Sequence, residues 1–117
     1  MHQHEKLNYV EFPAVDLEAT KAFFGAAFDW QFTDYGPDYS AFSNAGLEGG
    51  FYQAELKSRT LVGGALLVFY SANLETTQVK IEKAGGIVAK PTFSFPGGRR
   101  FQFYEPSGNE FAVWSDL

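Results

Sequence analysis

The sequence predicts a single α+β domain built from two copies of one β-α-β-β-β unit. Three observations lead to this fold class. A chain of 117 residues has room for one hydrophobic core. A five-residue motif occurs twice, starting at positions 16 and 73 and therefore 57 residues apart, as Asp16-Leu17-Glu18-Ala19-Thr20 and Asn73-Leu74-Glu75-Thr76-Thr77. Each copy follows a strand-like apolar run and precedes three short strand candidates, so the repeat extends beyond the motif.

The motif marks the start of a helix in each unit. Asp16 and Asn73 have side chains suited to a helix N-cap, and Glu18 and Glu75 fall in the first turn, where the helix dipole favours negative charge. We expect the second helix to stop at Gly85-Gly86. Apolar residues at helical spacing predict one buried stripe per helix, formed by Leu17, Phe24 and Phe28 and by Leu74, Ile81 and Ala84.

Eight short segments have strand-like composition and are separated by turn-forming residues such as Gly36-Pro37-Asp38. The first unit contains Leu7–Phe12, Trp30–Thr33, Tyr39–Ser43 and Gly50–Ala54. The second contains Ala65–Tyr70, Ile87–Lys90, Arg100–Tyr104 and Glu110–Trp114. We therefore expect one domain over residues 1–117, with module one at about 7–54, a linker at about 55–64 and module two at about 65–115.

Composition excludes several classes of protein. The net charge of −5 and the single tight basic cluster, Arg99-Arg100, argue against nucleic-acid binding, which needs a basic face. No apolar run is long enough to cross a membrane, and the first residues lack the apolar stretch of a signal peptide. Cysteine is absent, and no glycine-rich nucleotide-binding motif occurs. We expect a cytoplasmic protein with no nucleic-acid or membrane partner.

The order of the motifs resembles the vicinal oxygen chelate superfamily, which includes glyoxalases, bleomycin-resistance proteins and extradiol dioxygenases. The resemblance covers nearly the whole chain. It rests on two segments, Asn8–Leu17 at the first strand and helix start, and Phe103–Phe111 with its Glu-Pro-Ser-Gly-Asn turn. It implies that the two modules form an open, cup-shaped mixed sheet with helices outside, and that two chains pair as a homodimer.

Enzymes of this superfamily usually hold a divalent metal with His or Glu at four equivalent strand positions. The resemblance places at these positions Tyr9, Gly50, Leu66 and Ala112. A catalytic metal requires about three imidazole or carboxylate donors, whereas this set offers one phenol. We therefore expect no metal and no cofactor. Glu11 and Glu110 form the nearest substitute pair, which would suit a weakly held hard ion.

Strand alternation predicts which side chains share a face with those four positions. If Tyr9 faces the cup, Glu11 does too and provides a base or a hydrogen-bond acceptor. Arg100 follows Gly97-Gly98 and is suited to an anionic group, unless it and Arg99 are simply solvated strand-edge charges. The candidate ligand-binding residues are Tyr9, Glu11, Tyr52, Tyr70, Arg100 and Trp114. The competing interpretation is that the aromatic residues fill a core or a dimer interface.

Three functions are compatible with this pattern. The first is a metal-free module that binds a small aromatic or amphipathic molecule in an aromatic-lined cup. The second is a lyase or dioxygenase-type enzyme of the same superfamily. Such an enzyme would either hold a metal through ligands at positions other than these four, or use Glu11 or Tyr9 directly without a metal. The third is a non-catalytic interaction domain. His2 and His4 are the only imidazoles and belong to a terminus expected to be solvated, so no His-based catalytic arrangement is predicted.

Overall fold

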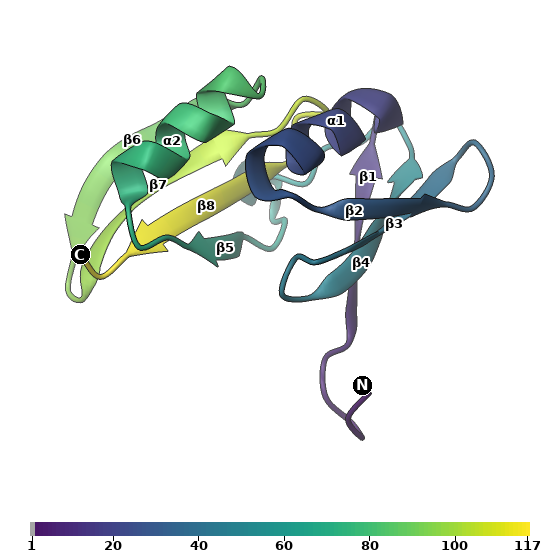
Figure 1. Cartoon of the computed structure of the whole chain (residues 1–117), viewed down its shortest axis with the longest axis horizontal. Helices are drawn as coiled ribbons and strands as arrows, with labels where there is room; N and C mark the ends of the chain where they lie inside the picture. The colour runs from purple at the N-terminus through teal and green to yellow at the C-terminus, as the bar shows by residue number, and fades with distance from the viewer. Residues whose placement is uncertain (1) are drawn as a thin grey trace.

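A computed structural model describes residues 2–117 and confirms the predicted fold class (Figure 1). The chain order is β-α-β-β-β twice, with a short 3-10 helix, η1 (Thr60–Val62), between the two units. Module one contains β1 (Tyr9–Ala14), α1 (Leu17–Phe28), β2 (Gln31–Asp34), β3 (Tyr39–Ser43) and β4 (Glu48–Gln53). Module two contains β5 (Leu67–Tyr70), α2 (Leu74–Lys83), β6 (Ile87–Phe95), β7 (Gly98–Tyr104) and β8 (Glu110–Ser115).

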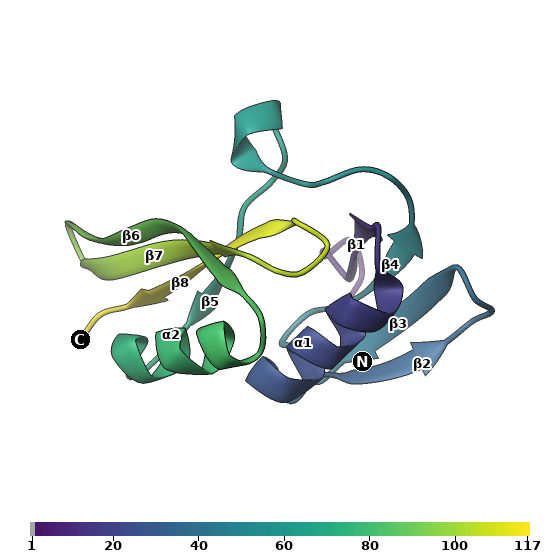
Figure 2. The ribbon, with the colours of Figure 1, turned by 90° about the horizontal axis from the view of Figure 1, so that it is seen from above.

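Each module forms its own four-stranded mixed sheet. The strand orders are β1-β4-β3-β2 and β5-β8-β7-β6, and in both sheets the first two strands are parallel while the others are antiparallel. The helix lies on one face of its own sheet, and α1 and α2 lie side by side (Figure 2). Neither of the two α-helices found in residues 2–117 has the length and apolar content needed to span a bilayer.

The predicted helix starts are confirmed. The Asp16 carboxylate accepts the Ala19 N–H at 3.1 Å, and the Asn73 side-chain oxygen accepts the Thr76 N–H at 3.1 Å. These bonds satisfy backbone donors that have no partner inside the helix. The left-handed conformation of Asp29 (φ 58°) ends the first helix.

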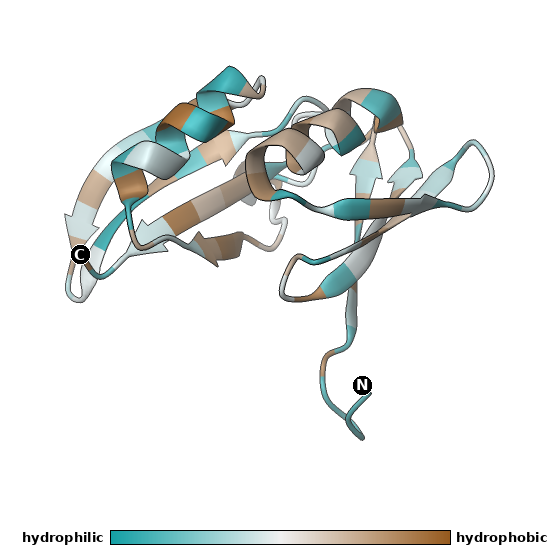
Figure 3. Cartoon of the chain, in the orientation of Figure 1, coloured by the Kyte–Doolittle hydropathy of each residue, from teal (hydrophilic) through white to brown (hydrophobic). Residues whose placement is uncertain are grey.

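Both predicted apolar stripes pack into the core. Figure 3 shows α1 largely in tan and brown bands on α2, β5 and β8. Phe24 is fully buried and stacks on Trp30 with ring centroids 4.1 Å apart. The core continues across the two modules, because Phe28 of α1 stacks on Phe69 of β5 at 4.2 Å. One aromatic core therefore holds both units together.

Several strand boundaries differ from the prediction. The largest difference is β6, which continues through Pro91 to Phe95 instead of ending at Lys90. Proline is tolerated there because β6 is an edge strand and its pairing with β7 shifts register near that residue. Leu66, expected within the fifth strand, lies just before β5.

The turn between β7 and β8 links module two to module one. Asn109, which is fully buried, donates from Nδ2 to the Pro13 carbonyl at the end of β1 at 2.7 Å. The Thr20 hydroxyl of α1 donates to Glu105 Oε1 at 2.7 Å. The Glu-Pro-Ser-Gly-Asn turn therefore fixes the position of one module against the other.

Four hydrogen bonds converge on the buried carboxylate of Glu105. Oε1 accepts from the Thr20 hydroxyl and the Ser107 N–H, and Oε2 accepts from the Asn109 N–H and Nδ2. Burial raises the pKa of Glu105, and these hydrogen bonds oppose that shift. Each carboxylate oxygen thus has two donors, which a neutral amide could not match.

Candidate functional site

Each sheet has one face covered by its helix and one face without a helix, here called the open face. In module one, Phe12 of β1 and Phe51 of β4 are buried on the helix side. Because strand side chains alternate, Tyr9 and Glu11 lie on the open face, where both are exposed. In module two, Phe69, Phe111 and Val113 are on the helix side, and their strand neighbours form the open face.

Three polar side chains form a chain of hydrogen bonds on the module-one open face. The Tyr39 hydroxyl donates to Glu11 Oε2 at 2.8 Å, and the Tyr9 and Tyr39 hydroxyl oxygens are 2.6 Å apart. The residues come from adjacent parts of one sheet, since β4 pairs with both β1 and β3. Burial, followed by the hydrogen bonds to Tyr9 and Glu11, raises the pKa of Tyr39 above its ordinary value. Tyr39 therefore remains protonated and acts as a donor.

Gly50 makes room for this arrangement. A Cβ atom at Gly50 would lie 2.2 Å from the Tyr39 hydroxyl oxygen and 2.5 Å from Cζ. Both distances are far below van der Waals contact, so any larger residue at position 50 would displace the phenol. The Tyr39 hydroxyl thus occupies the space that a side chain on β4 would otherwise fill.

The module-two open face carries a second group of aromatic and basic residues. Tyr70 of β5 and Trp114 of β8 are opposite each other and their rings make an edge contact at 5.2 Å. The Tyr70 hydroxyl donates to Asp116 at 2.7 Å, and this hydrogen bond raises the pKa of Tyr70. Arg100 of β7 lies opposite Trp114 and its guanidinium carbon is 5.1 Å from the Phe93 ring centroid.

A polar chain runs from Arg100 through Gln102 to Glu110 on this face. Arg100 Nη2 donates to Gln102 Oε1 at 3.3 Å, and Gln102 Nε2 donates to Glu110 Oε2 at 2.6 Å. Glu110 Oε1 accepts both the N–H and the hydroxyl of Thr60 at 2.8 Å. Burial alone would raise the pKa of Glu110, but these hydrogen bonds and the charge of Arg59 lower it overall. Arg100 Nε is buried with no hydrogen-bond partner among residues 2–117.

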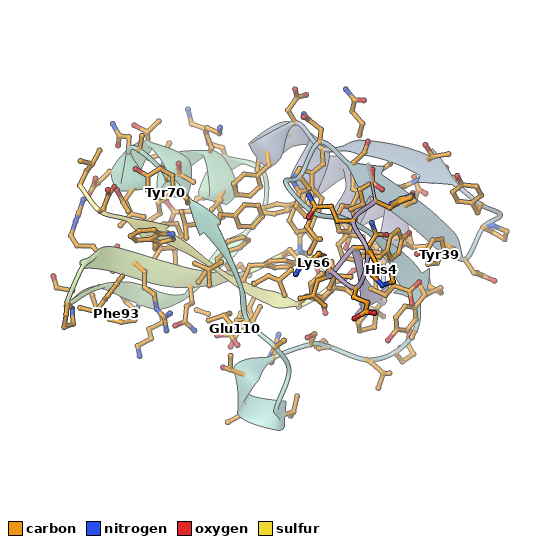
Figure 4. The ribbon with its side chains drawn as sticks, turned by 90° about the horizontal axis from the view of Figure 1, so that it is seen from below. His4, Lys6, Tyr39, Tyr70, Phe93 and Glu110 are labelled. Carbon is orange, nitrogen blue, oxygen red and sulfur yellow. The ribbon has the colours of Figure 1, made fainter. Side chains whose placement is uncertain are left out.

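The sequence-predicted ligand-binding residues therefore fall into two groups. Tyr9 and Glu11 share the module-one open face with Tyr52, which lies opposite Pro13 and Tyr39. Tyr70, Trp114 and Arg100 share the module-two open face, and Figure 4 shows Tyr39 and Tyr70 well apart in the view. Within the described residues, no hydrogen bond or ring contact joins the two groups.

Two cavities lie next to these groups. The larger, about 460 Å³, opens between the modules. It is mostly apolar and is lined by Val10, Trp30, Phe42, Ala45–Leu47, Leu67–Tyr70 and Phe111. The smaller, about 360 Å³, lies on module one and is lined by Tyr9, Thr33, Tyr35, Ala41–Ser43 and Glu48. Both are in the size range of small-molecule sites.

The residues present do not form the superfamily's usual metal site. Of the four expected positions, Gly50 and Ala112 have no donor atom, and Leu66 also has none. The remaining position, Tyr9, is hydrogen-bonded to Tyr39. In residues 2–117, no three or more side chains of the metal-binding types are placed to share one ion. The Glu110 carboxylate, half of the suggested substitute pair, is engaged by Thr60 and Gln102 on both oxygens.

Tyr39 is the main residue that the sequence analysis did not include in the site. Its strand had been predicted, with the bounds that the structure shows. The missing step was the hairpin register: β3 pairs with β4 so that Tyr39 lies opposite Tyr52 and Ala41 opposite Gly50. Alternation along a correctly paired hairpin would have put Tyr39 on the same face as Tyr9. Gln102 could have been found by alternation from Arg100 along β7, whereas Phe93 lies in the unpredicted extension of β6 and Thr60 lies in η1 of the linker.

Comparisons with known proteins agree with this architecture. A structure described as a glyoxalase/bleomycin resistance protein/dioxygenase family enzyme from Burkholderia phytofirmans PsJN superposes with a TM-score of 0.77 at 19% identity, covering 95% of this chain and 98% of that chain. The fosfomycin resistance protein FosX from Listeria monocytogenes gives a TM-score of 0.76 at 19% identity, covering 97% and 94%. Lactoylglutathione lyase from Agrobacterium tumefaciens gives 0.71 at 18% identity, covering 95% and 93%.

At these identities the structural likeness establishes the fold alone. A search of curated proteins finds no match. Residues 6–113, however, match the sequence model of one family, and this confirms the resemblance drawn from the two strand–turn motifs. The chain therefore belongs to the Glyoxalase/Bleomycin resistance protein/Dioxygenase superfamily.

Proposed function

We propose that this protein is a metal-free module that binds a small aromatic or amphipathic molecule. The proposal rests on the residues that occupy the four positions where the superfamily usually places its metal ligands. Three of them have no donor atom, and the space beside Gly50 is filled by the Tyr39 hydroxyl. A metal-dependent reaction would need imidazole or carboxylate donors that these four positions do not offer.

The surroundings favour binding of an apolar ligand with a few polar groups. The 460 Å³ cavity is lined by aromatic and aliphatic side chains, including Tyr70 of the predicted set. The polar side-chain groups within the lining are few: the indole N–H of Trp30 and the hydroxyl of Tyr70. A largely apolar wall with few polar contacts is typical of small-molecule sites.

Elemental analysis and metal titration test the metal-free part of the proposal. Protein purified without a polyhistidine tag should retain no stoichiometric metal, and Ni, Zn, Co and Mn should bind without a defined stoichiometry. Near-stoichiometric metal that is lost on Glu11→Gln would refute the proposal. It would favour the alternative, an enzyme of the lyase or dioxygenase type. Two proteins that share this fold are named as a lactoylglutathione lyase and a fosfomycin resistance protein.

A fragment screen by NMR tests the binding part. Fragments with aromatic rings should shift the backbone resonances of Leu67–Tyr70, which line the larger cavity. A Leu67→Trp substitution, which adds a bulky ring to the lining, should weaken these shifts. A chain that binds no fragment would instead favour the third candidate, an interaction domain whose aromatic surface is covered by a partner.

We further propose that the chain forms a homodimer in the cytoplasm. Apolar and aromatic side chains are exposed on both open faces, among them Tyr9, Val68 and Tyr70. Burying such surface between two chains would stabilise the pair. Sedimentation at micromolar concentration should give twice the mass of the 13.0 kDa chain, and a purely monomeric profile would refute dimerisation. Fractionation of expressing cells tests the location.

A further inference from the structure

The outer edge of β5 presents unpaired backbone groups. β5 lies at the edge of its sheet and pairs with β8 on one side alone. The Ser71 N–H donates to the Trp114 carbonyl at 2.8 Å, and the residue directly opposite Trp114 is Tyr70. In a parallel ladder alternate residues bond to the partner strand, so the N–H and C=O of Val68 and Tyr70 point away from β8. No backbone group from another segment of residues 2–117 pairs with these outward groups.

The 460 Å³ cavity runs along this edge. Its lining includes four consecutive residues of β5, Leu67–Tyr70. A cavity over one face of a strand would meet alternate residues, because successive side chains point to opposite faces. The outward N–H and C=O groups of β5 therefore border the cavity, in the plane of the sheet. The homodimer proposed above buries open-face side chains, which project out of that plane, so the two proposals use different groups.

The wall contributed by module one supplies a further donor. Trp30 is only 7% exposed and lines the cavity. Within residues 2–117 its indole N–H forms no hydrogen bond, yet it is not sealed in the interior, because Arg100 Nε is the one enclosed side-chain polar atom without a partner there. The indole N–H is therefore open to the cavity and lacks an acceptor, which is costly for a group on so buried a side chain.

The cavity favours a neutral, flat ligand. Among the described residues its lining contains no charged side chain, and the Tyr70 hydroxyl already donates to Asp116. A charged ligand would lose its hydration there without meeting a counter-charge. Ring surfaces are abundant in the lining, and two of them, Trp30 and Phe42, stack with centroids 4.3 Å apart. Planar rings pack well against such surfaces.

We infer that the cavity binds a neutral, planar heterocycle with a cyclic amide at its edge. The inference rests on the proposed small-molecule function and adds the class of ligand. The amide N–H donates to the Val68 carbonyl and the amide C=O accepts the Tyr70 N–H, as an added strand would. A second acceptor on the ring takes the Trp30 N–H, while the ring packs against Phe42 and Phe69. A cavity of 460 Å³ suits a molecule of this kind.

Amide hydrogen exchange of the free chain tests the unpaired edge. The Val68 and Tyr70 amides should exchange about tenfold or more faster than those of Phe69 and Ser71, which belong to the ladder with β8. Equal protection of all four amides would overturn the inference. So would protection of Val68 and Tyr70 that grows with protein concentration, because a second chain would then occupy the edge.

Three matched probes test the ligand class on the full chain. Quinazolin-4-one carries the cyclic amide and a further ring nitrogen that accepts. 3-Methylquinazolin-4-one lacks the amide donor, and isoquinolin-1-one has CH in place of the accepting nitrogen. NMR titration follows the Tyr70 amide and the Trp30 indole N–H. Quinazolin-4-one should bind about tenfold more tightly than either analogue, because each analogue leaves one protein group unpaired.

A proline substitution removes the donor on the protein side. Tyr70→Pro deletes the outward N–H without loss of a ladder bond, and proline is tolerated on an edge strand. Tyr70→Ala removes the same ring but keeps the N–H, and is the matched control. Tyr70→Pro should bind quinazolin-4-one about tenfold more weakly than Tyr70→Ala does. If Tyr70→Pro does not fold, the three probes on the unmodified chain still decide.

The outcomes distinguish this inference from the proposed function. Equal binding of the three probes, or equal binding of quinazolin-4-one by Tyr70→Pro and Tyr70→Ala, would overturn the inference. Failure of quinazolin-4-one to shift the two followed resonances would also overturn it. In each case the proposed function stands as long as other aromatic fragments shift Leu67–Tyr70, and it fails separately if no fragment does.

Discussion

Replacing Gly50 with Ala should remove the hydrogen bonds that hold Tyr39 in the site. The new methyl group would be built 2.2 Å from the Tyr39 hydroxyl oxygen and 2.9 Å from Cε2. The ring must therefore withdraw by more than about 1 Å to reach ordinary van der Waals contact. At that displacement the bonds to Glu11 and Tyr9, now 2.8 Å and 2.6 Å long, are broken.

The size of the effect follows from these two bonds. A hydrogen bond to a charged group contributes about 1.5–3 kcal/mol, and one between neutral groups about 1 kcal/mol. Gly50 does not have a positive φ, so Ala is compatible with the backbone there. Ala in a strand is more stable than Gly by about 0.5–1 kcal/mol, and this gain offsets part of the loss. The lower end of the range applies because the cluster is partly exposed. We expect Gly50→Ala to lower the free energy of unfolding by about 1–2 kcal/mol.

A double-mutant cycle with Tyr39→Ala isolates the clash. In the Tyr39→Ala background no ring opposes the new methyl group, so Gly50→Ala should become neutral or stabilising by about 0.5 kcal/mol. Denaturant unfolding followed by tryptophan fluorescence measures all four proteins. An equal cost of Gly50→Ala in both backgrounds would refute the reasoning, since the cost would then not come from Tyr39. So would a Gly50→Ala protein as stable as the wild type.

Three further predictions concern stability. Glu105→Gln should lower the free energy of unfolding by about 3 kcal/mol at neutral pH, measured by denaturant unfolding, because an amide leaves two of the four donors unpaired. A decrease of less than about 1 kcal/mol would contradict the assigned hydrogen bonds. The pKa of Glu110 is lowered on folding, so its contribution is present above the unfolded value of about 4.5 and is lost as pH falls through the lower folded pKa. The stability gap between wild type and Glu110→Gln should accordingly narrow below that pH, and a constant gap would exclude this linkage. Phe24→Ala should lower the free energy of unfolding by about 3–5 kcal/mol, measured by thermal or denaturant unfolding, because it removes a ring from the centre of the aromatic core. A decrease near about 1 kcal/mol would contradict this and show that neighbouring side chains fill the cavity.

Much of the fold could be predicted because its signals are local. The caps at Asp16 and Asn73 and the apolar spacing through Phe24 and Ile81 depend on neighbours within a few residues, and all behave as expected. The repeat then fixes the order of elements, since equivalent sequences form equivalent units. The extension of β6 through Pro91 was not predictable from composition, because proline is acceptable there only at a sheet edge.

Only part of the candidate site could be predicted from the sequence. Alternation along β1 correctly puts Tyr9 and Glu11 on one face, since that depends on strand geometry alone. The role of Tyr39 depends on the register of two hairpin strands, which a single sequence does not specify. The separation of Tyr9 and Glu11 from Tyr70 and Arg100 likewise depends on how two sheets pack.

The family, the two repeated units and their helices thus follow from the amino-acid sequence alone. Tertiary structure alone decided that the Tyr39 hydroxyl fills the space at Gly50 and that the Glu105–Asn109 turn joins the modules. The physical reason is the range of the interactions. Capping and periodicity act over one or two turns of chain, whereas the hydrogen bond between Asn109 and Pro13 spans 96 residues and exists only after both modules have packed.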